Sequence, residues 1–238
     1  DGYDHADRTE LPGYGALQAD AADLDDDGYT DLVLVNYGSP HYSYIYWGSE
    51  DGFSEDDRDD IYTVNARKVH IEDFDQDGYL DLAFASYYGA QYVYWGGYGG
   101  FSTSNRTTLY ANYAYDLAAE DLDGDGYTDL VYTAHYKYYD GDGYDTYAYV
   151  YYGSSVGFDD EDHDALDVKD ARRVAVSDLD DDGYPDIVFA NYYDGTDYQN
   201  VDSYIYWGSS AGYSEIFRDE LPTYGALSLV ITPDAPNF

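Results

Sequence analysis

The chain has 238 residues, of which 50 are acidic and 10 are basic, so its formal net charge at pH 7 is −40. This charge repels nucleic acids and anionic lipid surfaces, and we expect neither as a partner. The sequence has no cysteine, which excludes disulfides, and no run of 18 apolar residues, which argues against membrane insertion. It neither begins with Met nor carries an apolar signal segment, so we expect a mature or excised chain.

The first predicted strand has small apolar residues at Ala16, Ala19 and Ala21. The phrase DLDDDGYTD, residues 23–31, follows it. A nearly continuous apolar run, residues 32–35, predicts a second strand that is buried on both faces. The Tyr-rich segment YIYWG, residues 44–48, predicts a third strand, and a fourth fits before the next module.

The same phrases return three more times along the chain. The Asp phrase starts again at Asp73, Asp121 and Asp178, and the Tyr-rich phrase recurs at 92–96, 149–153 and 204–208. Trp47 precedes the next Asp phrase by 26 residues, as do the matching residues of the next two modules. The interval from the start of an Asp phrase to the Trp or Tyr before the Gly of the following Tyr-rich phrase varies from 22 to 31 residues. Each module therefore has one elastic loop, which we place between its second and third strands.

These modules span about 14–63, 64–111, 112–168 and 169–222 within a single domain, 1–238. Repeated four-stranded units of about 50 residues predict an all-β fold, a β-propeller of four complete blades. Residues 1–12 resemble residues 211–222, and residues 220–232 resemble residues 10–22. We therefore expect an orphan strand at each end, over 1–12 and 224–232. An unpaired apolar strand is an association hazard, so we expect copies to join head to tail through these terminal strands.

Each Asp phrase has the composition of a cation-binding loop. Counted from its first residue, positions 1, 3, 5 and 9 are Asp, position 6 is Gly and position 7 is Tyr in all four copies. Calcium takes about six to eight oxygen ligands, and a tight loop supplies them from alternate side chains and one backbone carbonyl. Position 12 lies in a strand-like run and is never Glu, which argues against an EF-hand. Magnesium, which keeps several waters, suits such a carboxylate cage less well.

One such loop alone would also be compatible with a metal-free Asx turn, but four complete copies favour calcium, one ion in each module. The predicted ligands are the position-7 carbonyls and the carboxylates at positions 1, 3, 5 and 9. They are Asp23, Asp25, Asp27, Tyr29 and Asp31 in the first loop; Asp73, Asp75, Asp77, Tyr79 and Asp81 in the second; Asp121, Asp123, Asp125, Tyr127 and Asp129 in the third; and Asp178, Asp180, Asp182, Tyr184 and Asp186 in the fourth.

The phrases DLDDDGYTDLVLVNYG and SYIYWGS, with the GFS that follows, resemble FG-GAP/VCBS-type repeats, which also form the heads of integrin α-chains. The resemblance extends over essentially the whole chain. It implies a calcium-binding β-propeller with the ion in the hairpin between the first and second strands of each blade. It also implies an extracellular or cell-surface setting in adhesion, surface assembly or carbohydrate contact, and it names no partner.

The remaining residues point to no enzyme. The five histidines share no position in the modules, and no serine lies in a nucleophile elbow. We therefore expect a non-enzymatic surface adhesion module or a self-assembling structural module that can form fibres, whose partner is another copy, a cell-surface protein or a glycan. The alternative is a lectin-like carbohydrate-binding propeller, followed by a polysaccharide-degrading enzyme on the same scaffold. Predicted ligand contacts in the elastic loops are Tyr138, Tyr139, Tyr192 and Tyr193.

Overall fold

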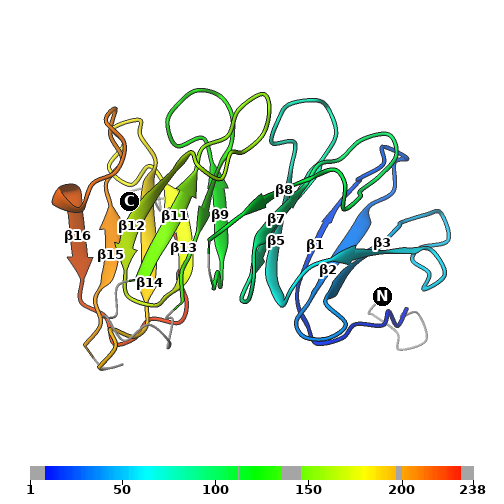
Figure 1. Cartoon of the computed structure of the whole chain (residues 1–238), viewed down its shortest axis with the longest axis horizontal. Coiled ribbons are helices and arrows are strands. Elements are labelled where there is room, and N and C mark those ends of the chain that lie inside the picture. The colour runs from blue at the N-terminus through cyan, green and yellow to red at the C-terminus, as the bar shows by residue number, and fades with distance from the viewer. Residues whose placement is uncertain (1–8, 112, 136–145, 197–199, 232–238) are drawn as a thin grey trace, which may run out of the picture.

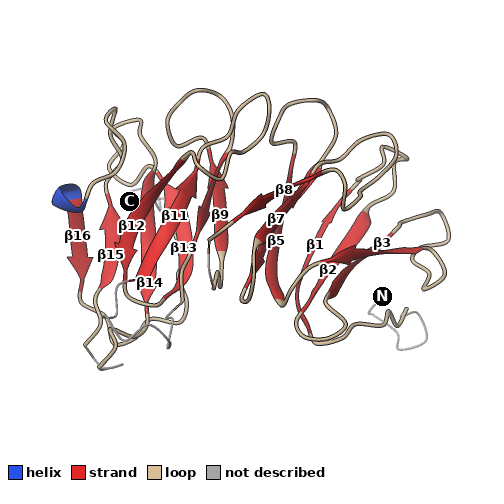
Figure 2. Ribbon diagram, viewed as in Figure 1, coloured by secondary structure: helices blue, strands red, loops and turns tan. Residues whose placement is uncertain are grey.

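The computed structural model describes residues 9–111, 113–135, 146–196 and 200–231. Strands dominate this part of the chain (Figures 1 and 2), and its one short 3-10 helix is Glu215–Phe217. The strands form four antiparallel sheets of four strands, and each sheet takes consecutive strands in chain order. The all-β, four-module prediction is thus confirmed at the level of sheets. No helix in the described residues is both long and apolar enough to cross a membrane.

The strand bounds repeat from sheet to sheet. The first sheet contains β1 (Ala16–Ala22), β2 (Asp31–Asn36), β3 (Tyr42–Tyr46) and β4 (Arg58–Tyr62). The second contains β5 (Ala66–Glu72), β6 (Asp81–Ser86), β7 (Gln91–Tyr94) and β8 (Arg106–Leu109). The third contains β9 (Leu117–Glu120), β10 (Asp129–Tyr132), β11 (Thr146–Tyr151) and β12 (His163–Val168). The fourth contains β13 (Ala171–Ser177), β14 (Asp186–Asn191), β15 (Ser203–Tyr206) and β16 (Arg218–Leu221).

The second strand of each sheet forms the core, as its apolar run predicts. All residues of β6, β10 and β14 are buried. The two faces of β6, and likewise those of β10, contribute to two different apolar clusters. In β6, alternate side chains point toward the two neighbouring sheets. Leu82 and Phe84 belong to the cluster shared with the first sheet, whereas Ala83 and Ala85 belong to the cluster shared with the third.

The sheets lie side by side in a row. Figure 1 places β1–β4 at one end of the row and β13–β16 at the other. Three apolar clusters fill the spaces between neighbouring sheets, one for each adjacent pair. Within every sheet the Asp loop joins the first two strands at one end, and the elastic loop joins the second and third strands at the opposite end.

The first strand of three sheets contains the same irregularity. Its register against the second strand shifts at Leu17, Arg67 and Arg172, each of which is an extra residue in the ladder. Such a bulge bends the strand and redirects the side chain of the extra residue. The bulges lie at the end of the strand away from the Asp loop.

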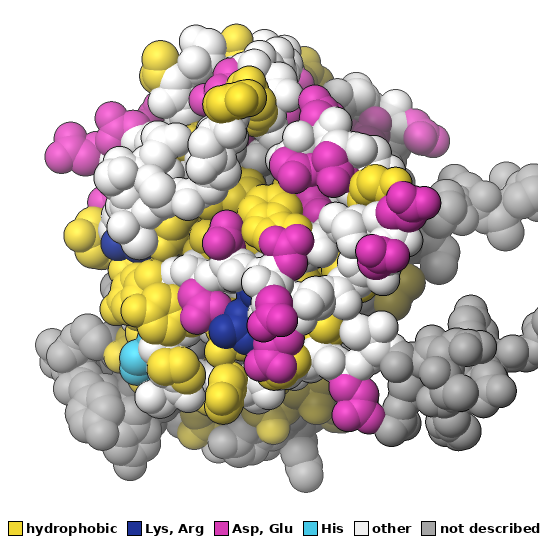
Figure 3. Space-filling view, turned by 90° about the vertical axis from the view of Figure 1, so that its right-hand side faces the viewer, with side chains coloured by type: hydrophobic (Ala, Val, Ile, Leu, Met, Phe, Trp, Pro, Cys, Tyr) yellow, Lys and Arg dark blue, Asp and Glu magenta, His cyan; other side chains and the backbone are white. Residues whose placement is uncertain are grey.

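The two outer faces of the row are more exposed than the matching internal faces. Ala19 of the first sheet is exposed, whereas Val69, at the matching position of the second sheet, is buried. At the other end, Leu221 is 40% exposed, although Leu109, at the matching position of the second sheet, is fully buried. Figure 3 looks at the end that carries the first sheet and shows apolar side chains gathered there among carboxylates.

The expected terminal strands are not formed in the described residues. Residues 9–12 and 224–231 are irregular backbone, and residues 1–8 and 232 lie outside the described ranges. A strand forms only where a neighbouring strand pairs with its backbone, and neither segment has such a neighbour among the described strands. Both segments still contact the sheets: the Tyr46 hydroxyl donates to the Pro12 carbonyl at 2.7 Å, and the Ala226 N–H donates to the Asn191 carbonyl at 2.8 Å.

Candidate metal centre

Each Asp loop is the hairpin between the first and second strands of its sheet, as the sequence predicts. The backbone turns sharply because positions 4 and 6 both have positive φ in all four copies. Position 6 is Gly with φ between 91° and 94°, a conformation that other residues rarely adopt. Position 4 is occupied by Asp26, Gln76, Gly124 and Asp181, with φ between 59° and 78°. The four loops therefore share one shape.

The loop backbone is held by its own carboxylates. In the first loop, the Gly28 N–H donates to Asp23 at 2.9 Å, and the Tyr29 N–H donates to Asp27 at 2.8 Å. The Asp27 N–H donates to both Asp23 and Asp25, at 3.1 and 3.2 Å. The second and fourth loops repeat all four bonds. These bonds draw the carboxylates at positions 1 and 3 toward the same point.

The position-9 aspartates connect the loop to the rest of the sheet. In the second loop, Asp81 is 1% exposed; it accepts a hydrogen bond from the Phe74 N–H at 3.0 Å and another from the Gly96 N–H at 2.7 Å. Phe74 lies in the same loop, whereas Gly96 follows the third strand. The same pair of bonds occurs at Asp31, Asp129 and Asp186. Each of these carboxylates therefore fixes the loop to the end of the third strand.

The glycine after each Tyr-Trp or Tyr-Tyr pair makes this connection possible. A Cβ at Gly96 would overlap the Leu80 carbonyl oxygen, and Gly48, Gly153 and Gly208 have the same close approach. Only Gly allows these two segments of the chain to approach so closely. Sequence reasoning missed this role, although the invariant Gly of the Tyr-rich phrase was its visible signal.

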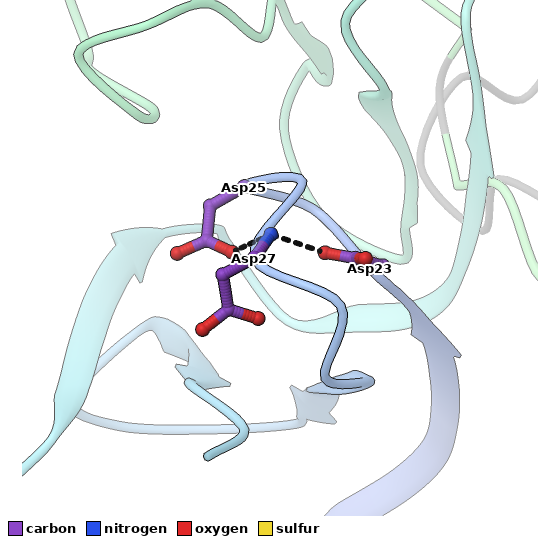
Figure 4. Close-up of side chains that lie close together, drawn as sticks. All are labelled: Asp23, Asp25 and Asp27. Carbon is purple, nitrogen blue, oxygen red and sulfur yellow. Dashed lines mark hydrogen bonds between the residues drawn. The ribbon is translucent and has the colours of Figure 1, made fainter. Parts of the chain in front are cut away.

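Three aspartates converge in every loop. Each set offers carboxylate oxygens that lie within 4.8 Å of one another, a spacing that could hold a metal ion. The first set is Asp23, Asp25 and Asp27, shown in Figure 4. The other three are Asp73, Asp75 and Asp81; Asp121, Asp123 and Asp129; and Asp178, Asp180 and Asp186.

The clusters contain only part of the predicted ligand set. Positions 1 and 3 belong to every cluster, position 9 to the last three, and position 5 only to the first. In all four loops the position-5 carboxylate accepts a hydrogen bond from the Tyr N–H at position 7, as Asp77 does from Tyr79. Ligation by positions 5 and 7 stays a prediction.

Burial makes the position-9 carboxylates hard to ionise. It raises the pKa of Asp81 and of Asp129 to about 7, and the neighbouring carboxylates add to the rise. Burial likewise raises the pKa of Asp31 and Asp186. The two backbone N–H donors on each carboxylate act in the opposite direction. A bound cation would favour the charged form at all these positions.

Comparison with known proteins finds the same repeat. Residues 73–132 match the model of the FG-GAP-like repeat, a segment that begins at the second Asp loop and ends with β10. No curated protein sequence matches the chain.

Two solved structures are similar in backbone. One is BBS1N in complex with ARL6DN, soaked with lead, at 13% identity and a TM-score of 0.49; the match covers 85% of this chain and 53% of that one. The other is the V. cholerae biofilm matrix protein Bap1, at 16% identity and a TM-score of 0.37, with 94% and 41% covered. The chain thus spans about half the length of these proteins or less.

Proposed function

We propose that the protein is a non-enzymatic, extracellular calcium-binding β-propeller module with an adhesive or structural role, and that it joins to copies of itself. The observation that carries the proposal is the convergence of three carboxylates in each of four loops of the same shape. The FG-GAP-like repeat matched by residues 73–132 supports the propeller arrangement of the sheets.

Calcium suits these loops better than other metals. The donors are all oxygen, without His or Cys, which favours a hard cation. In our assignment, positions 1, 3, 5 and 9 give carboxylates and the Tyr at position 7 gives its carbonyl, enough for most of the six to eight ligands of calcium. Extracellular calcium is abundant enough to fill even weak sites of about 0.1–1 mM dissociation constant, which favours an extracellular role.

The bound ions would do structural work. Sixteen loop carboxylates repel one another while the loops fold, and a divalent cation in each loop offsets that repulsion. Because the position-9 aspartate also bonds the end of the third strand, an ion there would fix three strands of a sheet at once. In this proposal the calcium ions make the module rigid and take no part in a reaction.

The outer faces of the row favour contact with a second copy. Between the first and second sheets, Val33 and Ile45 belong to one apolar cluster with Leu82 and Phe84. Each end of the row carries the residues of one side of such an interface, without a neighbouring sheet of the described chain against them. Ile205, which matches Ile45, is half-buried on the fourth sheet, and Leu34, which matches Phe84, is half-buried on the first. The face of one copy thus carries the residue types that complement the opposite face of the next.

A contact between unlike ends is head to tail, and it forms a ring or a fibre according to its rotation. We assign the terminal segments 9–12 and 224–231 to the same contact. Leu227 and Val230 in the second segment are 60% and 77% exposed, which favours burial against a partner.

Calcium removal tests the function directly. A ligand that binds only the native state at a hundredfold excess over its dissociation constant stabilises it by about 2.7 kcal/mol per site. We expect excess chelator to lower the Tm by more than about 10 °C, and high salt to restore part of the loss by screening the carboxylates. An unchanged Tm would contradict the proposal.

Stoichiometry provides the sharper measurement. Calorimetric titration of the chelated protein should give four calcium ions per chain. The variant Asp75→Asn, within the second cluster, should bind three, whereas Asp51→Asn, an exposed acid in a turn outside the loops, should bind four. Equal stoichiometry in the two variants would count against the assigned sites.

A further inference from the structure

The few basic residues are not spread evenly over the acidic chain. Eight of them lie in the described ranges. Three, Arg58, Arg106 and Arg218, lie at the start of outer strands, and each guanidinium is 3.9–4.0 Å from the centroid of a Tyr ring in the same sheet. The other five lie on or just before the first strands of the second and fourth sheets: Arg67, Lys68, Lys169, Arg172 and Arg173.

The bulges of these first strands place two of the arginines around one aromatic ring. Arg67 and Arg172 are the extra residues of their ladders, and their guanidinium carbons lie 3.9 and 4.2 Å from the ring centroid of Tyr115. Arg67 also lies 4.8 Å from the Tyr87 ring, and Arg172 lies 4.6 Å from the Tyr192 ring. Such stacking holds guanidinium planes in fixed orientations.

Two of these cations have no carboxylate partner in the described part of the chain. Lys68 pairs with Asp116 at 2.7 Å, and Arg172 pairs with Asp170 at 3.0 Å. No ion pair involves Arg67 or Arg173 within those residues, although the chain has five acids for every base. The Nε of Arg67 is buried and has no hydrogen-bond partner there. Because this Nε is enclosed, the terminal nitrogens of Arg67 are the donors left for a ligand in the cavity.

A cavity of about 350 Å³ opens between the first strands, within the size range of small-molecule sites. Arg67, Lys68, Asp116 and Arg173 line it, so its wall carries two uncompensated positive charges. Apolar wall comes from Leu17, Val174 and Leu229, and aromatic wall from Tyr115. Gln18 also lines the cavity, and its side-chain oxygen accepts from the Val69 N–H at 2.8 Å. That bond orients the Gln18 amide and leaves its NH₂ group to donate.

We propose that this cavity binds a sugar that bears a carboxylate, of the uronic acid class. Arg67 and Arg173 supply the charge-assisted hydrogen bonds for the carboxylate. The apolar and aromatic wall packs on the C–H face of the ring, and the Gln18 NH₂ donates to a hydroxyl. An acidic peptide would offer the same carboxylate without a ring to cover the apolar wall. The site is separate from the calcium loops, at the opposite end of the first strands.

The test compares methyl glucuronoside with methyl glucoside, which differ only in the carboxylate. Ligand-observed NMR titration of the full chain in saturating calcium should show glucuronoside binding at least tenfold tighter than glucoside, and weaker binding at higher salt. Equal affinities, or no binding of either sugar, would overturn the proposal. Tighter binding of a short oligoglutamate than of the glucuronoside would overturn the assignment to a sugar.

Variants then locate the site. Arg173 is exposed, and within the described residues its side chain makes one hydrogen bond, to the Arg172 carbonyl, so Arg173→Gln should fold normally and lose at least tenfold in glucuronoside affinity. Lys169→Gln is the matched control, because Lys169 pairs with Asp167 and does not line the cavity. Calcium stoichiometry should stay at four in both variants, which separates this site from the proposed calcium function. Equal affinity in the two variants would refute the location.

Discussion

Gly96 lies where three parts of the second module meet. Its N–H donates to Asp81, and its Cα faces the Leu80 carbonyl so closely that a Cβ would overlap the oxygen. We expect Gly96→Ala to lower the free energy of unfolding by about 1–3 kcal/mol, the usual cost of overpacking a close contact.

Gly99 provides the control for that measurement. It lies in the turn that follows, and a Cβ there would meet no atom within 4 Å. Gly99→Ala should therefore change stability by no more than about 0.5 kcal/mol. Denaturant unfolding in saturating calcium measures both variants. Similar losses in the two would mean that the close approach is not the cause.

At the scale of the element, the second strands of the first and second sheets offer a matched pair. Leu32 and Leu82 hold the same place in their strands, but Leu82 is fully buried between two sheets and Leu32 is half-buried on the outer face. We expect Leu82→Ala to cost about 2–5 kcal/mol in unfolding free energy, because it leaves a cavity. Leu32→Ala should cost clearly less in dilute solution, where its face is open to water. Equal costs would show that the outer face is covered.

At the scale of the whole molecule, the two outer faces should control association. A charge on either face should break the head-to-tail contact without unfolding the chain, because the positions are already exposed. We expect Ala19→Glu and Leu221→Glu to shift the mass measured by analytical ultracentrifugation toward the monomer. Val156→Glu adds the same charge at an 89% exposed turn residue and should associate like the parent chain. A parent chain that stays monomeric in calcium at every concentration would contradict the contact.

The sequence predicts the parts of the molecule that depend on local pattern. The apolar run before Asn36 gives a central strand, and the Asp-Gly spacing gives the shape and place of each loop. Features that depend on tertiary approach were missed. The hydrogen bond that the Gly96 N–H donates to Asp81 joins residues 15 apart, and the stacking of Arg67 on Tyr115 joins the second module to the third. The terminal strands stay a prediction, because residues 1–8 and 232 lie outside the described ranges and residues 9–12 and 224–231 have no partner strand within them.

Of the four tyrosines predicted as ligand contacts in the elastic loops, two lie in the described residues and two do not. Tyr138 and Tyr139 lie outside the described residues. Tyr192 lies over Arg172, and the Tyr193 hydroxyl donates to the Gly195 carbonyl at 2.7 Å. The prediction that Tyr192 contacts a ligand rests on its place in the elastic loop, and it stays a prediction. Its contact with Arg172 depends on a strand bulge that the sequence pattern does not indicate.

The separation of the two kinds of loop has an evolutionary consequence. Every length difference between modules falls in the loop after the second strand, at the end of the sheet away from the Asp loop. Doubling the length of such a loop costs only about 0.6 kcal/mol in closure entropy. Selection can therefore lengthen, shorten and recompose one rim of the molecule by insertion and drift, while the opposite rim keeps its geometry. A lineage that duplicates this module keeps the rim of Asp loops unchanged and can vary the rim of elastic loops.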